Sequence, residues 1–169
     1  MPEPRALSFP SLDAVMPEVD RLLAGHTTTG AWSLGQILDH LATAVRLTCL
    51  GRRETASGLR SEVYKRKFFR DGRFPTGVEA PHPSLIPAAG SDPREQAEAL
   101  RNALARFISA PGPFPDHPLL GALDKDEWAQ FHCIHCAHHL GFARPAGELT
   151  APGGTSLRMS APTASGTRD

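Results

Sequence analysis

Two segments of the chain open with the same helix-start pattern, which constrains the possible folds more than any other feature. Ser33 is followed three residues later by Gln36, and Asp124 by Glu127. In such a capping box, the side chain of the first residue accepts a hydrogen bond from the backbone N–H of the residue three positions later. The side chain of that later residue in turn accepts one from the backbone N–H of the first. Apolar residues then recur with the spacing of one helix face. The sequence therefore predicts two long helices, over 32–50 and 124–142.

Two further segments show the same periodicity. Ser11 can cap a helix over 11–24, in which Pro17 stands past the first turn, so we expect either a kink there or a helix that begins near Pro17. Asp92 caps a helix over 92–109, with a proline at its first position. Four helical segments in all need partners for their apolar faces.

The remaining segments are less regular. Proline and glycine recur through 51–90, where only 61–70 has the pattern of a short helix. The residues 145–169 are rich in small and polar types, which predicts a disordered tail after a domain over 1–144. No convincing pair of strands is predicted. We therefore expect an all-α fold, a four-helix bundle with a long irregular connection between its second and third helices.

Composition narrows the functional classes. Lysine plus arginine and aspartate plus glutamate both number 18, so no basic excess favours nucleic acid as a partner. No apolar run is long enough for a membrane span, and the N-terminus lacks the layout of a signal peptide. Three cysteines do not suit a secreted disulfide scaffold. We expect a soluble cytoplasmic protein, with a homodimer as one open arrangement.

Histidines supply the candidate chemistry. His135 and His139 lie four residues apart in the last predicted helix, so they share one face, one turn apart. Two imidazoles in this relation can bind one metal ion, and His40 of the second predicted helix is the best candidate for a third ligand. The alternative is that these are ordinary core or surface histidines, because the spacing is common by chance.

Neighbouring residues have more open roles. His132 shares the ligand face and could be a fourth ligand or a group that supports the ligands, whereas His138 points away and fits a rim position. Cys133 and Cys136 form a single Cys-x-x-Cys motif, which is weak evidence for zinc, and small buried hydrophobes are the better interpretation. His117 could line the mouth of a pocket.

The chain resembles the DinB/YfiT-like superfamily of metalloenzymes, and within it an uncharacterised branch, from about residue 11 to residue 142. The resemblance rests on four separated motifs that occur in the same order: Trp-Ser-Leu-Gly-Gln at 32–36 with His40-Leu41, His-Pro-x-x-Gly at 117–121, Glu127-Trp128, and His-x-x-His-His-Leu at 135–140. It implies a four-helix bundle with an unusual helix order. It also implies a divalent metal held by His40, His135 and His139.

Three functional hypotheses follow. In the first, three neutral imidazoles leave an open coordination position, typical of catalytic zinc, and the protein is a metal-dependent enzyme. The resemblance implies a thiol-dependent transferase or a hydrolase that uses a low-molecular-weight thiol, acting here on a small molecule. Three histidines suit Zn, Ni, Fe or Cu, and we expect Zn or Ni as the ion. In the second, the protein is a non-catalytic binding or dimerising bundle with a structural metal. In the third, no metal binds and hydrogen bonds satisfy the histidines.

Overall fold

The computed structural model describes residues 3–51, 59–74 and 83–148. It is mostly helical. The α-helices of the described residues are α1 (Val15–Leu23), α2 (Leu34–Leu50), α3 (Leu59–Asp71), α4 (Pro93–Ser109) and α5 (Lys125–Leu140). Three short 3-10 turns, η1 (Leu12–Ala14), η2 (Pro83–Leu85) and η3 (Ala146–Glu148), and two short strands, β1 (His26–Thr28) and β2 (Ala143–Pro145), complete these elements.

Both predicted capping boxes are present. The Ser33 hydroxyl accepts a hydrogen bond from the Gln36 backbone, and the Gln36 side chain accepts one from the Ser33 backbone. Asp124 and Glu127 make the same two bonds at the start of α5. Asp92 caps α4 through two backbone N–H groups. The helix starts are therefore set by local side-chain chemistry that can be read from the sequence.

The first helix starts later than its cap residue predicts. Ser11 makes no side-chain capping bond, and a 3-10 turn precedes α1, which begins at Val15. Pro17 consequently lies in the first turn of α1, where a backbone N–H has no intrahelical partner to lose. Of the two alternatives, the helix that begins near Pro17 is confirmed.

The described residues contain one feature that the sequence did not predict, a two-stranded antiparallel sheet. His26 pairs with Pro145, and Thr28 pairs with Ala143. Strands of three residues are too short for an alternating pattern to be recognised. The sheet and η3 extend the described structure past the expected domain boundary at residue 144, and the rest of the predicted tail, 149–169, lies outside the described residues.

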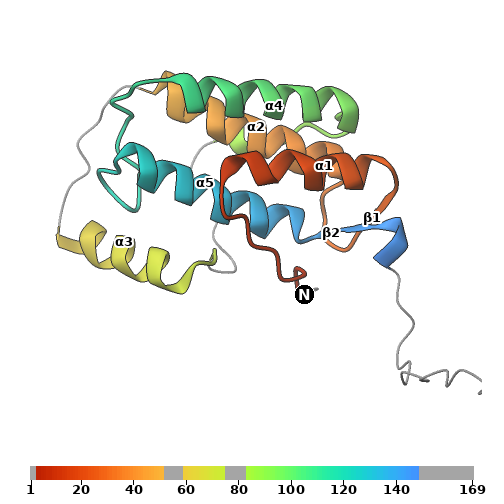
Figure 1. Cartoon of the computed structure of the whole chain (residues 1–169), viewed down its shortest axis with the longest axis horizontal. Helices are drawn as coiled ribbons and strands as arrows, with labels where there is room; N and C mark the ends of the chain where they lie inside the picture. Colours follow the sequence, from red (N-terminus) through yellow and green to blue (C-terminus); the bar gives the residue numbers. More distant parts are fainter. Residues whose placement is uncertain (1–2, 52–58, 75–82, 149–169) are drawn as a thin grey trace, which may run out of the picture.

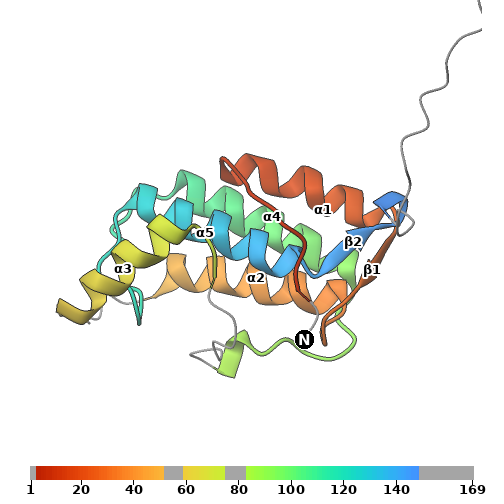
Figure 2. The same ribbon diagram turned by 90° about the horizontal axis from the view of Figure 1, so that it is seen from below.

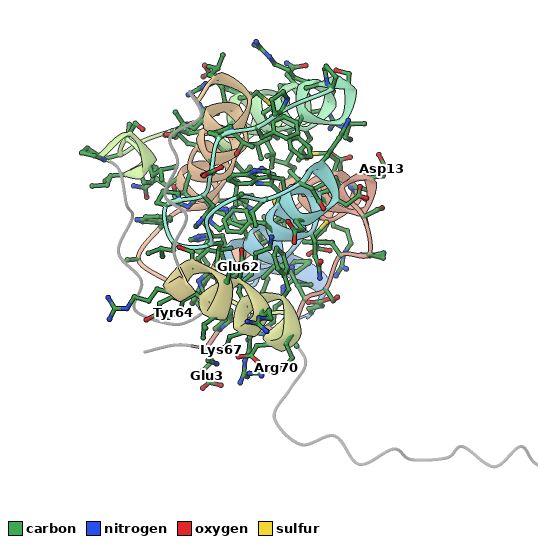
Figure 3. All side chains as sticks on the ribbon, turned by 90° about the vertical axis from the view of Figure 1, so that its left-hand side faces the viewer. Glu3, Asp13, Glu62, Tyr64, Lys67 and Arg70 are labelled. Carbon is green, nitrogen blue, oxygen red and sulfur yellow. The ribbon has the colours of Figure 1, made fainter. Side chains whose placement is uncertain are left out.

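Helices α1, α2, α4 and α5 lie side by side around an apolar core, whereas α3 lies against one end of this group (Figures 1 and 2). Among its described side chains, α3 buries Phe68, which packs on Phe131 of α5. Lys67 and Arg70 project outward from α3 (Figure 3). The short helix predicted over 61–70 is thus confirmed, as part of a helix of 13 residues.

None of the described helices is both long enough and apolar enough to cross a lipid bilayer.

Candidate metal centre

The three predicted ligands come together from two helices. His40 comes from the middle of α2, and His135 and His139 come from the last two turns of α5. One ligand atom from each imidazole lies within 4.8 Å of the other two. Tetrahedral zinc–nitrogen bonds would set these atoms about 3.3 Å apart, so small ring rotations close the group around one ion.

His40 and His135 contact each other through their ring nitrogens. Their Nε2 atoms are 3.1 Å apart. The Nδ1 atom of His40 lies 2.6 Å from the carbonyl oxygen of Leu85, which can only accept, so Nδ1 carries the proton. In the neutral ring this leaves a lone pair on the Nε2 atom of His40, directed at His135. That is the tautomer a metal ligand needs.

Burial keeps these imidazoles neutral. His40 and His135 are buried and His139 is half-buried. Burial lowers the pKa of His40, and burial with the neighbouring imidazoles lowers the pKa of His135 further. The same causes lower the pKa of His139 to about 2. All three rings are therefore ready to donate a lone pair at neutral pH without first losing a proton.

Aromatic rings surround the three histidines. Trp32 is stacked on His139, with ring centroids 5.6 Å apart, and also contacts His40 at 5.0 Å. Phe74 lies 4.9 Å from the ring of His135. The only charged side chain that perturbs His40, His135 or His139 among the described residues is Asp39, beside His40. The donor set is therefore neutral, and a divalent ion would keep its full charge for an anionic ligand.

His132 does not join the group. It is 1% exposed, stacked on Trp128 and edge-on to Phe107, and it is not among the residues whose ligand atoms converge. Neither of its ring nitrogens has a hydrogen-bond partner among the described residues. The structure therefore gives no support to the prediction of a fourth ligand, because the side chain points into the aromatic core.

The cysteines behave as small buried hydrophobes, as predicted. Cys133 and Cys136 are both buried and both are free thiols. Burial raises the pKa of Cys133 to about 11 and raises that of Cys136 as well. Thiols in this state are poor metal ligands and poor nucleophiles at neutral pH, which separates them from the chemistry of the histidines.

The two remaining histidines of interest have structural roles. His117 accepts backbone hydrogen bonds at Nδ1 from Leu119 and Leu120, each at 3.1 Å, and so holds the turn before α5. His138 packs against Phe74 and Phe142, which agrees with the predicted rim position beside the metal ligands.

A cavity of about 420 Å³ lies away from the histidines, between α3, the loop before α5 and the first turn of α5. The expectation that His117 lines a pocket mouth is wrong for this cavity, because His117 is not among its lining residues. The lysines of the cavity are already engaged, since Lys65 pairs with Glu127 at 2.7 Å and Lys125 donates to two backbone carbonyls. None of the three converging histidines lines it. The group that could hold a metal ion is therefore separate from this cavity.

Comparison with known proteins gives one finding. The model of a family described as "Protein of unknown function (DUF1569)" matches residues 1–146. No curated protein and no solved structure matches the chain. The match includes all three histidines of the candidate centre.

Proposed function

Because the chain belongs to the DUF1569 family, whose function is unknown, its chemistry must be argued from its own residues, and we propose that it is a metal-dependent enzyme. In this proposal, His40, His135 and His139 hold one divalent ion, zinc or nickel, and leave a coordination position open. The supporting observation is the convergence of three neutral ligand atoms within 4.8 Å. Three protein ligands with an open position are typical of catalytic zinc.

The fold gives further support. One histidine from the second helix of the core and an i, i+4 pair from the last helix are the arrangement that the DinB/YfiT-like resemblance implies. Helices α1, α2, α4 and α5 lie together as such a bundle requires (Figure 2). We therefore propose that this chain is a four-helix bundle of the DinB/YfiT-like type, to which β1, β2 and α3 are additions.

The neutral donor set favours an anionic reactant. When bound, a divalent ion lowers the pKa of a coordinated water or thiol and so supplies a nucleophile at neutral pH. The aromatic rings of Trp32 and Phe74 pack on His139 and His135, and the half-buried His139 is the most accessible of the three histidines. We propose a thiol-dependent transferase or a hydrolase that acts on a small molecule, with a low-molecular-weight thiol as the thiol substrate.

The test combines metal content with turnover. Tag-free protein is analysed for bound metal and then assayed for thiol addition and hydrolysis with a panel of electrophilic small molecules. The proposal predicts about one equivalent of metal, turnover that a chelator abolishes, and loss of both in His139→Ala. His138→Ala is the matched control, because it removes an adjacent imidazole outside the ligand set and should retain metal.

Three results would contradict the proposal. Metal binding with no turnover on any substrate, together with a large fall in melting temperature of His139→Ala, would indicate a structural metal in a non-catalytic bundle. Protein that binds neither zinc nor nickel would show that hydrogen bonds alone satisfy the histidines. Turnover that survives chelation and the His139→Ala change would place the chemistry elsewhere.

A further inference from the structure

The segment that comprises η2 and the residues after it, 83–91, runs beneath α2 (Figure 2) and contacts it at three levels, His40, Asp39 and Gly35. We call it the α2 strap. At its first level the Leu85 carbonyl meets the ring of His40. Further along, Ala88 and Ser91 meet the side chain of Asp39. The strap therefore follows the face of α2 that carries a candidate metal ligand.

The carboxylate of Asp39 accepts hydrogen bonds from the second half of the strap. One carboxylate oxygen, Oδ2, accepts from the Ala88 backbone N–H and from the Ser91 hydroxyl, each at 3.4 Å. The single proton of the Ser91 hydroxyl is shared with the Ala88 carbonyl oxygen, which lies closer, at 3.0 Å, so the turn is also closed on itself. The residue next to a metal ligand on α2 thus fixes the segment that contacts that ligand.

Gly35 sets how closely the strap approaches. A Cβ atom built at Gly35 would lie 1.8 Å from the Ser91 carbonyl oxygen. Since this oxygen belongs to the backbone, no side-chain rotation could relieve the overlap, and the strap itself would have to move. The close approach one turn before Asp39 therefore needs a residue without a Cβ atom.

The Leu85 carbonyl accepts a hydrogen bond from the ring nitrogen of His40 that would not bind the metal. Metal-binding histidines commonly donate their second ring N–H to a carbonyl or carboxylate, which fixes the ring and its tautomer. His40 has such a partner, whereas the Nδ1 atom of His135 has none among the described residues. The orientation of the triad thus depends strongly on this one tether.

We propose that the α2 strap is the device that positions His40 for metal binding, and that Asp39 and Gly35 are positioning residues that act through the Leu85 carbonyl. This inference rests on the proposed metal site. Loss of a second-sphere partner typically weakens metal affinity by about 10- to 100-fold. Loosening the strap should therefore weaken zinc binding by about 10-fold, although neither residue would touch the ion.

The experiment measures zinc affinity of the tag-free full chain by competition with a chromogenic chelator. Asp39→Ala removes the strap bonds, and Asp39→Asn keeps an acceptor oxygen but removes the charge. Gly35→Ala displaces Ser91, and Gly147→Ala is its matched control, because a Cβ atom there would meet nothing within 4 Å. Nitrogen NMR of the histidine rings reports the tautomer of His40 in each metal-free variant.

The inference predicts about 10-fold weaker zinc binding in Asp39→Ala and Gly35→Ala, with Asp39→Asn and Gly147→Ala close to the wild type. It also predicts that His40 is protonated at Nδ1 in the wild type and becomes a mixture of tautomers in Asp39→Ala. Wild-type affinity in both strap variants would overturn it. So would an Asp39→Asn variant as weak as Asp39→Ala, because the cause would then be charge. Wild-type protein that binds no zinc would instead refute the metal site itself.

Discussion

The Nε2 atoms of His40 and His135 lie 3.1 Å apart, although the residues are 95 positions apart in the sequence. The proton that His40 donates to Leu85 leaves its Nε2 atom as an acceptor facing the second ring. In the metal-free protein, one N–H···N bond can join the rings, and it leaves the buried Nδ1 atom of His135 without a partner among the described residues. A cation between the two Nε2 atoms would instead allow both rings to direct lone pairs at it.

The first prediction concerns the pH dependence of metal binding. Because burial holds the pKa of His139 at about 2 and lowers that of His40 and His135, few protons need to leave when the ion binds. Three ordinary imidazoles would lose up to about 1000-fold in affinity on going from pH 8 to 5.5. We expect a change below about 10-fold for this protein. Calorimetry in two buffers of different ionisation enthalpy at pH 6 checks this by counting the protons released; two or more would contradict the prediction.

The second prediction concerns the stability contribution of His132. Both of its ring nitrogens are buried without partners among the described residues, so replacing the imidazole with an apolar side chain of similar size removes a desolvation cost. His132→Leu should raise the free energy of unfolding by about 1 kcal/mol at pH 7.5. Urea unfolding measures this value, and a variant less stable than the wild type would show that the ring makes a favourable interaction.

The pH dependence of the same variant gives an independent check. Burial lowers the pKa of His132 to about 3, so the folded chain binds fewer protons than the unfolded chain, whose imidazole titrates near 6.5. Stability therefore falls as the pH drops below about 6.5, and this residue costs about 1.4 kcal/mol by pH 5.5. The advantage of His132→Leu should grow correspondingly between pH 7.5 and 5.5. An advantage that stays constant would argue against a neutral, buried ring.

The third prediction concerns the attachment of the N-terminal segment. Arg5 pairs with Glu18, both nearly buried, and also donates to the Ala143 carbonyl at 2.7 Å. Arg5→Ala leaves Glu18 with Arg21 as its partner, at 3.1 Å, but removes the nearly buried guanidinium and its bonds, so it should destabilise the protein by about 2 kcal/mol. Arg101→Ala, which removes an exposed pair with Asp20, should cost less than about 1 kcal/mol. Similar losses in thermal unfolding of the two variants would contradict this ranking.

The extent to which sequence predicted this structure depends on the range of each interaction. Capping boxes act over three residues, so Ser33 and Asp124 marked their helix starts correctly. The i, i+4 relation of His135 and His139 is equally local. The pairing of β1 with β2 depends on strands of only three residues, too short for an alternating pattern, so it could not be predicted.

The sequence also could not predict the contacts that loop residues make with the histidines of the site. The Leu85 carbonyl is a backbone group, which no residue type reveals, and Phe74 follows an exposed helix with one buried residue among its described side chains. His132 shows the opposite error, because a residue of a metal-binding type on the correct face of α5 points into the aromatic core instead. A signal for the strap did exist in Gly35, a glycine inside a helix, which often marks a close backbone approach.

The most direct test of the metal centre is a zinc titration of tag-free protein, comparing the wild type with His40→Ala and with His138→Ala. All three chains keep α5, but only His40→Ala removes a proposed ligand. We predict one equivalent of zinc for the wild type and His138→Ala, and affinity weaker by on the order of 100-fold or more for His40→Ala, a larger loss than a second-sphere partner causes. Equal affinity of His40→Ala and the wild type would contradict the proposed centre, because the imidazole of α2 would then not bind the ion.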